Sequence, residues 1–263
     1  YQSGFCYSVE VSVAKIVSIH SYRGGTGKSN LTANLATAIA LQGNRVAVID
    51  TDIPSPGIHV IFGLDDQKID KTLNDYLWGR CTIADAAYDV TPSSANPNGG
   101  QVFLVPSSVN ADEIARILNQ GYDFRLLNDG LRQLVRQLDI DYLLIDTHPG
   151  LNKETLLSIA VSNLVLLILR PDQQDFQGTA VTVDVARQLD ARQMLLIVNK
   201  VLSSMDQNAL REQVTQTYKV PVAGVFTLSE EMIYLASNGI FFLRYPDHPF
   251  SQELRRVVAQ VVG

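Results

Sequence analysis

The stretch SYRGGTGKSN, residues 21–30, decides the fold, because it places a glycine-rich turn, a lysine and a hydroxyl group between two apolar segments. Gly24, Gly25 and Gly27 let successive backbone N–H groups turn toward one anion. A helix that begins near Ser29 points the positive end of its dipole at the same place. The stretch therefore predicts a loop between a strand and a helix that binds the phosphates of a nucleotide.

Lys28 and Ser29 carry separate parts of that chemistry. Lys28 can reach the β and γ phosphates, where it is expected to act in binding and in catalysis, and the Ser29 hydroxyl can ligate Mg²⁺. A magnesium-bound nucleotide is therefore the expected ligand. The residues of this segment predicted to contact it are Arg23, Gly24, Gly25, Thr26, Gly27, Lys28, Ser29 and Asn30.

Around this loop, short apolar runs alternate with longer amphipathic segments. The runs are rich in Val, Ile and Leu and predict seven strands, at 14–21, 45–52, 101–108, 141–148, 164–171, 194–201 and 221–228. Helical patterns lie between and after them, at 29–42, 112–119, 124–138, 153–162, 174–189, 206–218, 229–237 and 250–262. The alternation predicts an α/β fold, with a mostly parallel sheet of seven to eight strands and helices on both faces, in three α/β/α layers.

The composition indicates one sizeable domain. The chain has 263 residues, of which 46% are hydrophobic and 18% charged, so it can bury a large core. We expect a flexible or tag-derived N-terminus at 1–12 and a single domain at 13–263. The net charge of -6 gives no overall attraction to nucleic acid or to an anionic membrane.

The sequence predicts a cytoplasmic protein. No apolar run reaches the roughly 18 residues of a membrane span, and the start of the chain lacks a basic segment followed by an apolar one. Cys6 and Cys81 are the only cysteines and lie far apart, so neither a disulfide framework nor a thiolate metal cluster is expected. Two buried thiols in a reducing compartment are expected instead.

Two further predicted strands end in aspartates, namely Asp50 and Asp52 in VIDTD and Asp146 in LLIDTHPG. The carboxyl ends of parallel strands meet at one edge, where ligands bind. Asp146 is expected to hold Mg²⁺ directly or through a water, with Asp50 as a further ligand. Either Asp50 or Asp52 is expected to position or deprotonate the attacking water. Helix N-capping is the alternative role for each aspartate, and we interpret His148 as a spacer rather than a general base.

The preference for a base is inferred from VNKVLS, residues 198–203, at the end of the sixth predicted strand. GTPases recognise guanine with N-K-x-D, whose aspartate accepts from the ring, but Asn199 and Lys200 are followed here by Val201 and Leu202. Adenine is therefore favoured. Asn199, Lys200 and Thr227 are predicted nucleotide contacts, and satisfying loop backbone groups is the alternative role for Asn199.

The loop resembles the deviant Walker A motif of the MinD and ParA ATPases, K-G-G-x-G-K-[ST], within the P-loop NTPase fold. VIDTD is similar to the second motif of that family, LLIDTHPG to its Walker B and switch loop, and GVFTLSEEMIYLASNGIFF (224–242) to the segments that close the nucleotide pocket. Two positions depart from the pattern. Arg23 replaces the signature lysine, and Asn30 stands where a second threonine is common, which affects the hydrolysis rate and the contacts to the α-phosphate.

The resemblance implies slow, partner-stimulated hydrolysis of ATP to ADP and phosphate, and a homodimer that forms on ATP with its two nucleotides facing each other. Arg23 is then expected to cross the interface as a catalytic cation. The alternative is that Arg23 is exposed to solvent and turned away from phosphate, with its charge offset by nearby carboxylates. Such a protein acts as a nucleotide switch in the positioning or partitioning of a cargo and has an activating partner protein. The alternative is an adaptor that binds nucleotide in order to dimerise, with little turnover. Iron–sulfur carriers share the loop, but their thiolate ligands are lacking here.

The surface on which such a protein would work is the least specified feature. Residues 250–262 place Phe250, Leu254, Val257, Val258 and Val261 on one stripe, which we interpret as core-facing, so a membrane is the less expected partner. Non-specific DNA stays open as a partner. The candidate contacts are Arg187, Arg192, Arg211 and Lys219, with Asp184, Asp190, Asp206 and Glu212 among them.

Overall fold

The computed structural model of the chain describes residues 14–95 and 98–263. The expected flexible or tag-derived N-terminus at 1–12 lies outside the described residues, as does Cys6. Cys81 is only half-buried, so the expectation of a buried thiol is wrong at this position. Among the described residues, none of the helices is both long enough and apolar enough to span a membrane.

An eight-stranded sheet forms the middle of the structure. Its strand order is β3-β4-β2-β5-β1-β6-β7-β8, and all neighbouring pairs are parallel except β3 with β4. The strands are β1 (Lys15–His20), β2 (Arg45–Asp50), β3 (Tyr88–Asp89), β4 (Gln101–Val105), β5 (Tyr142–Asp146), β6 (Leu164–Leu169), β7 (Met194–Val201) and β8 (Val222–Thr227). All seven predicted strands are confirmed. β3 was not predicted, because two residues are too short to show a pattern.

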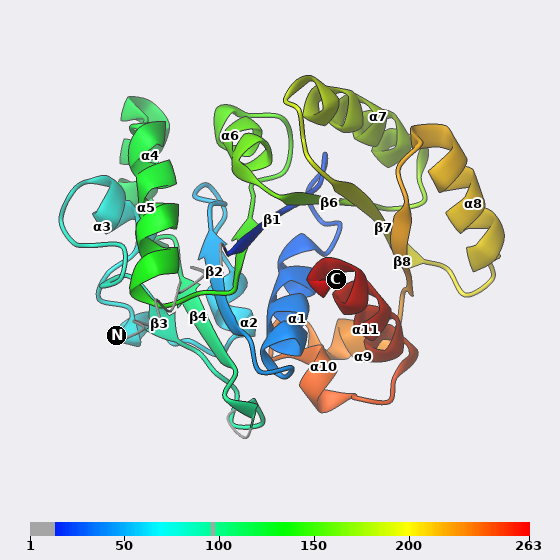
Figure 1. Ribbon diagram of the computed structural model, residues 1–263, viewed down its shortest axis with the longest axis horizontal. Helices are drawn as coiled ribbons and strands as arrows, with labels where there is room; N and C mark the ends of the chain where they lie inside the picture. Colours follow the sequence, from blue (N-terminus) through cyan, green and yellow to red (C-terminus); the bar gives the residue numbers. More distant parts are fainter. Residues whose placement is uncertain (1–13, 96–97) are drawn as a thin grey trace, which may run out of the picture.

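Helices cover both faces of the sheet, which confirms the predicted three-layer α/β fold. Figure 1 shows α1, α10 and α11 on one side of the sheet and α6, α7 and α8 on the other. The longer helices are α1 (Lys28–Ala40), α4 (Ala111–Gln120), α5 (Phe124–Gln137), α6 (Lys153–Val161), α7 (Gln173–Gln188), α8 (Gln207–Tyr218) and α11 (Pro249–Val262). The shorter ones are α2 (Ile58–Ile61), the 3-10 helix η1 (Asp66–Lys68), α3 (Leu73–Leu77), α9 (Glu230–Leu235) and α10 (Phe241–Arg244).

The apolar stripe of α11 packs into the core, as expected from its spacing. Phe250, Leu254, Val257, Val258 and Val261 are all buried in the hydrophobic cluster that α11 forms with α1 and the sheet. On the other face, one cluster gathers around α5 and a second around α7 and α8. The α11 stripe is thus covered by the protein's own core.

The topology fixes where a ligand can bind. β1 lies between β5 and β6, so the chain leaves the centre of the sheet in both directions and the loop after β1 stands at the switch point. Asp50 of β2 and Asp146 of β5 are paired across neighbouring parallel strands. The loop that follows β1 and the aspartates that end β2 and β5 therefore meet at one edge of the sheet.

Candidate functional site

The loop between β1 and α1 has the backbone that its glycines predict. Gly25 and Gly27 have φ values of 76° and 91°, in the left-handed region that side chains disfavour. A Cβ atom on Gly27 would lie 2.6 Å from the Asn199 side-chain nitrogen, so the loop could not keep this contact with a larger residue. Thr26 Oγ1 is buried and has no hydrogen-bond partner among the described residues, as expected for a group that awaits a ligand.

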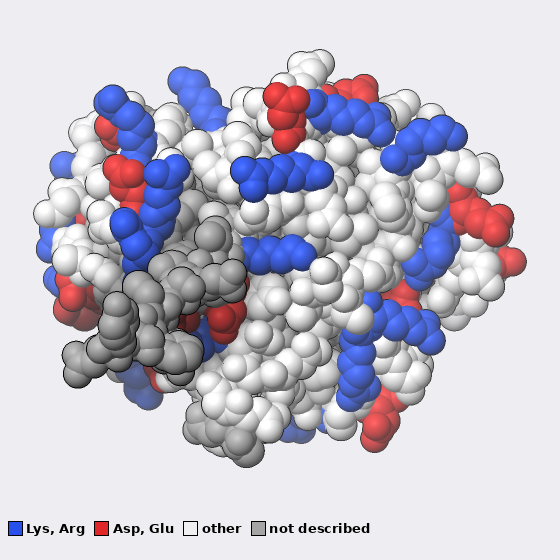
Figure 2. Space-filling model, in the orientation of Figure 1, with Lys and Arg blue, Asp and Glu red and all other residues white. Residues whose placement is uncertain are grey.

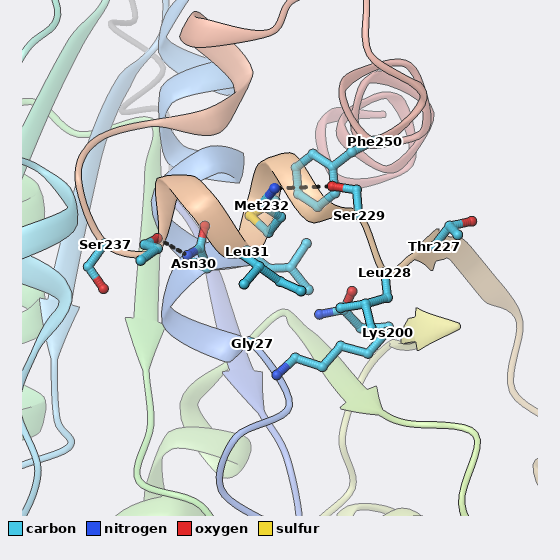
Figure 3. Close-up of a pocket in the computed structure, with 13 residues that line it drawn as sticks. Gly27, Asn30, Leu31, Lys200, Thr227, Leu228, Ser229, Met232, Ser237 and Phe250 are labelled. Atoms are coloured by element: carbon cyan, nitrogen blue, oxygen red, sulfur yellow. Dashed lines mark hydrogen bonds between the residues drawn. The ribbon is translucent and has the colours of Figure 1, made fainter. Parts of the chain in front are cut away.

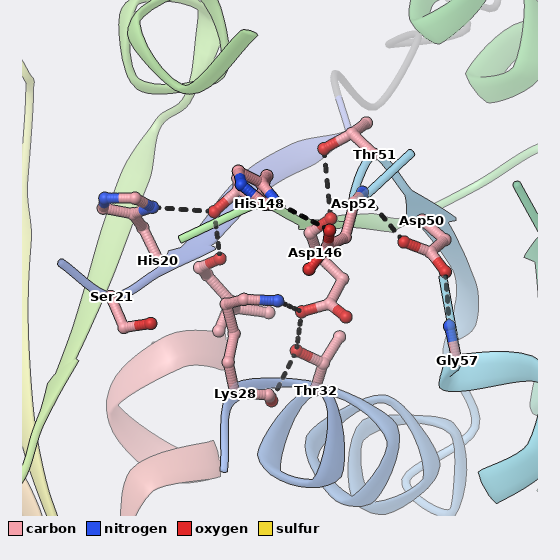
Figure 4. A network of polar contacts seen from close by, with 12 residues as sticks. His20, Ser21, Lys28, Thr32, Asp50, Thr51, Asp52, Gly57, Asp146 and His148 are labelled. Atoms are coloured by element: carbon pink, nitrogen blue, oxygen red, sulfur yellow. Dashed lines mark hydrogen bonds and ion pairs between the residues drawn. The ribbon is translucent and has the colours of Figure 1, made fainter. Parts of the chain in front are cut away.

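Lys28 is tied to the end of β5. Its Nζ lies 2.9 Å from Asp146 Oδ1, with the lysine side chain 7% and the aspartate side chain 1% exposed. Thr32 Oγ1, one turn further along α1, lies 3.1 Å from the same oxygen. Figure 4 shows both groups pointing at Asp146. The structure thus brings together the predicted phosphate cation and the predicted metal ligand.

Asp50 lies in the same network without a cationic hydrogen-bond partner. Its two oxygens accept from the backbone N–H groups of Asp52, at 2.9 Å, and Gly57, at 3.3 Å. Burial, and next the neighbouring Asp146 carboxylate, raise the pKa of Asp50 far above its ordinary value. Two neighbouring buried carboxylates, of which Asp146 is paired with Lys28, make an environment that favours a further cation.

Asp52 is paired with His148, which the sequence did not indicate. The Asp52 Oδ1 atom lies 2.6 Å from His148 Nδ1, between the loops that follow β2 and β5. Figure 4 shows this contact beside the Lys28–Asp146 pair. Sequence reasoning missed the pair because the two residues lie 96 positions apart.

His20 ends β1 and is a second functional-site residue that sequence reasoning missed. Its Nδ1 lies 2.8 Å from Thr147 Oγ1, and that hydroxyl donates to the Ile19 carbonyl. The hydroxyl proton is thereby used, so Nδ1 must carry the proton of the imidazole. Burial lowers the pKa of His20 to about 3, with help from the Lys28 charge. The available signal was a histidine that ends an otherwise apolar strand.

Arg23 points away from the phosphate-binding loop and toward α7. Its guanidinium lies 3.7 Å from carboxylate oxygens of both Asp172 and Asp175, and its side chain is 40% exposed. The preceding Tyr22 lies so close to α7 that a Cβ on Gly178 would fall 1.9 Å from the tyrosine ring. The two residues that distinguish this loop thus both contact the first half of α7.

A pocket of about 290 Å³ opens beside the loop, at the position expected for a base. Figure 3 shows its lining residues, which come from α1, the ends of β7 and β8, α9, α11 and the loops next to them. The described residues that line it include no aspartate or glutamate: Gly27, Asn30, Leu31, Asn199, Lys200, Thr227, Leu228, Ser229, Met232, Ile233, Ala236, Ser237 and Phe250. Apolar side chains, among them Leu31, Met232 and Phe250, stand beside amide and hydroxyl groups in this lining, a combination that suits an aromatic ring with polar edges.

Asn199 and Lys200 both hold the phosphate-binding loop. Asn199 Nδ2 donates to the Thr26 carbonyl at 2.7 Å, and Lys200 Nζ donates to the Gly25 carbonyl at 2.7 Å. The alternative role of Asn199, satisfying loop backbone groups, is therefore present. One hydrogen of Nδ2 is used in this bond, and the Asn199 Oδ1 atom could accept from an exocyclic amine of a base. Thr227 lies at the rim and accepts from Gln207 Nε2.

The residues predicted to ligate Mg²⁺ fit a metal that is held mainly by nucleotide phosphates. Ser29, in the first turn of α1, is partly exposed, and Asp146 lies against the neighbouring Lys28. Within residues 14–95 and 98–263, no group of three or more His, Cys, Asp or Glu side chains is placed to hold a metal alone. One hydroxyl with phosphate oxygens and water suits the octahedral oxygen shell of Mg²⁺.

The basic residues considered for DNA binding are partly engaged within the protein. Arg187 pairs with Asp184 and donates to the Tyr218 carbonyl, and Arg211 pairs with Glu253. On the face in Figure 2, Lys and Arg stand singly or in small groups, with Asp and Glu among them. This distribution differs from the continuous basic stripe that is typical of nucleic-acid-binding surfaces.

The chain matches the family model of an AAA domain over residues 14–217. An uncharacterised ATP-binding protein of Methanocaldococcus jannaschii is 29% identical over 95% of this chain and 89% of the relative. The septum site-determining protein MinD of Pyrococcus horikoshii, solved with Mg-ADP, superposes with a TM-score of 0.79 at 23% identity, covering 95% of this chain and 96% of that structure. The MinC:MinD complex of Aquifex aeolicus superposes with a TM-score of 0.78 at 22% identity, covering 95% of this chain and 96% of that structure.

The chain therefore belongs to the AAA-domain family, as a nucleotide-binding protein with the P-loop ATPase fold. Its fold is that of the MinD and ParA-family ATPases of known structure.

Proposed function

We propose that residues 13–263 act as a single P-loop ATPase domain that binds Mg-ATP, hydrolyses it slowly and switches between monomer and dimer to position a cellular cargo. The observation that carries the proposal is the meeting of three strand ends at one edge: the loop with Lys28, and the carboxylates of Asp50, Asp52 and Asp146. The relatives named for septum site determination, and those solved with Mg-ADP or with MinC, support a nucleotide-dependent positioning role.

In this proposal each side chain has one task. Lys28 binds the β and γ phosphates, and Mg²⁺, held by Ser29 and Asp146, neutralises charge on the phosphate oxygens. Asp52 orients the attacking water. Asn199 accepts from the adenine amine through Oδ1, and the apolar side chains of the pocket contact the ring.

Removal of the lysine charge tests the binding half. In Lys28→Ala, the affinity for Mg-ATP by calorimetry should fall by at least about 100-fold, because the phosphates lose the ammonium group of the loop. Lys28→Gln keeps a donor for the buried Asp146 carboxylate, so it separates lost binding from lost folding. The control is Lys68→Ala, which removes an exposed charge from η1. Unchanged affinity in both Lys28 variants would refute the assignment.

Removal of the Asp52 carboxylate tests the catalytic half. Asp52→Ala should retain Mg-ATP binding while phosphate release falls strongly, because only an interaction needed in the transition state is lost. Equal losses of binding and turnover would assign Asp52 to the metal or to the fold and make Asp50 the better candidate.

The preference for adenine is tested by the affinities of the wild-type protein for ATP and GTP. An equal or greater affinity for GTP would contradict the adenine pocket.

The role of Arg23 distinguishes the proposed ATPase switch from the alternative, an adaptor that binds nucleotide in order to dimerise and hydrolyses little of it. To act across a dimer, its guanidinium has to leave Asp172 and Asp175, and its partial exposure supports such a movement. The contacts with these carboxylates are the observation that favours the adaptor instead. Steady-state phosphate release, with and without a candidate partner protein, distinguishes the two functions.

Dimerisation is measured by light scattering of Asp52→Ala with and without ATP. ATP should double the mass of this variant. Arg23→Ala in the same background should weaken the dimer, because the planar guanidinium would no longer form paired hydrogen bonds with phosphate oxygens across the interface. The ATP affinity should stay within about 2-fold. Arg125→Ala, at the 90% exposed arginine of α5, is the control. A protein that stays monomeric with ATP, or that dimerises equally without Arg23, contradicts the switch.

A further inference from the structure

We propose that His148 is a positioning residue that orients the Asp52 carboxylate toward the attacking water. The inference rests on the proposed ATPase function and assigns a task to a side chain that the chemistry above does not use. His148 would touch neither nucleotide nor water and would act only through Asp52.

The contact between the two side chains is short and specific. His148 Nδ1 lies 2.6 Å from Asp52 Oδ1, and these side chains are 30% and 12% exposed. Within residues 14–95 and 98–263, His148 is the only group that hydrogen-bonds the Asp52 carboxylate. In the proposed arrangement His148 Nδ1 is the donor and the Asp52 carboxylate the acceptor. The other oxygen, Asp52 Oδ2, is then left to accept from water.

The backbone around His148 is anchored on both sides, so its ring can hold the aspartate in place. Thr147 before it donates from N and Oγ1 to the Ile19 carbonyl, and Gly150 after it donates to the Ser21 carbonyl. The His148 carbonyl accepts from Thr155 Oγ1 of α6 at 3.3 Å. The loop after β5 is thereby fixed to the loop after β1, and the ring of His148 extends from it to Asp52.

A carboxylate on a loop gains catalytic value from such a holder. Asp52 lies in the loop just after the end of β2 at Asp50, and rotation about its side-chain bonds would displace Oδ2. A misplacement of about 1 Å can lower a rate by about 100-fold. A hydrogen bond that fixes one oxygen removes most of this rotation without occupying the oxygen that faces the water.

The test compares His148→Ala with His148→Asn, whose Nδ2 can replace the Nδ1 donor. In His148→Ala, kcat for ATP should fall by about 10-fold or more, while KM and the calorimetric affinity for ATP stay within about 2-fold, because ground-state phosphate contacts are intact. His148→Asn should recover most of the lost kcat. His248→Ala, at the N-cap of α11, is the matched control for loss of a histidine.

Coupling to Asp52 gives a second readout. Adding His148→Ala to Asp52→Ala should lower kcat no further, because the group that His148 orients is already absent. Affinity for ADP with aluminium fluoride, which mimics the transferring phosphoryl group, should fall in His148→Ala while affinity for ADP alone does not. This readout does not depend on fast turnover.

The outcomes separate the inference from the function on which it rests. If wild type turns over and His148→Ala has the same kcat, or if the effects of the two alanine variants add, the inference is wrong and the proposed function stands. A His148→Asn kcat as low as that of His148→Ala also overturns it. If wild type neither turns over nor prefers ADP with aluminium fluoride to ADP alone, both the function and the inference are wrong.

Discussion

Acidification should destabilise the protein through His20, and the size of the effect follows from its burial. Burial lowers the pKa of His20 to about 3, from an ordinary value of 6.5. The folded state therefore takes up no proton on this ring at moderately acidic pH, whereas the unfolded chain does. The stability contributed by the neutral ring is present above about pH 6.5 and is lost as the pH falls from there toward 3.

The magnitude depends mainly on the unfolded chain. A pH of 5 is about 1.5 units below the pKa of an unperturbed histidine, and each unit corresponds to about 1.4 kcal/mol. The free energy of unfolding should therefore fall by about 2 kcal/mol between pH 7.5 and pH 5. The result is the same for any folded-state pKa well below 5.

Urea unfolding at pH 7.5, 6.5 and 5 measures this effect by comparing wild type with His20→Asn. The asparagine keeps a donor for Thr147 Oγ1 but does not titrate, so wild type should be the more stable at pH 7.5 and this advantage should shrink by about 2 kcal/mol at pH 5. The matched control is His248→Asn, the same exchange at the N-cap of α11, measured at the same three pH values. An unchanged difference between wild type and His20→Asn would refute the assignment of a neutral buried ring.

Three further substitutions test the site. Asp50→Asn should weaken Mg-ATP binding in calorimetry, because it removes a buried carboxylate next to Asp146, and an unchanged affinity contradicts a role for Asp50 at the metal. Gly178→Ala should lower the free energy of unfolding in urea by about 1–3 kcal/mol, because its Cβ would overlap the Tyr22 ring. Adding Tyr22→Ala should restore most of this loss, and no recovery in the double variant refutes the contact. Gly27→Ala should abolish Mg-ATP binding because its Cβ displaces Asn199 and its φ is 91°, and retained affinity contradicts the loop geometry.

The fold could be predicted because its signals are local and repeated. The parallel strands are buried along most of their length, so their sequences are mainly apolar, and β6, LVLLIL, is buried throughout. The longer helices between the strands show their own period. Of the shorter helices, α9 was predicted within 229–237, whereas α2, η1, α3 and α10 were not, because three to five residues are too few to show a period. One of them, α3, has a capping box between Thr72 and Asp75 that a search for T-x-x-D would have found.

The site could be predicted only in part, because half of it depends on partners far away in the chain. The phosphate-binding loop could be predicted because its glycines, Lys28 and Ser29 are neighbours in the sequence. Nothing local to Arg23 shows that Asp172 and Asp175 lie beside it, and nothing local to Asp52 shows His148. Such pairs follow from strand order, which a single sequence does not specify.

The Lys28–Asp146 pair joins residues 118 positions apart, and the Asn199–Thr26 bond joins residues 173 apart. During synthesis the phosphate-binding loop leaves the ribosome long before either partner exists, so an N-terminal fragment carries the motif without the site. Closing such long segments is slow, because their chain entropy is lost before the contacts form. Nucleotide that binds only the folded chain then stabilises these late contacts, by RT ln(1 + [L]/Kd), and its concentration helps to set how much of the newly made protein stays folded.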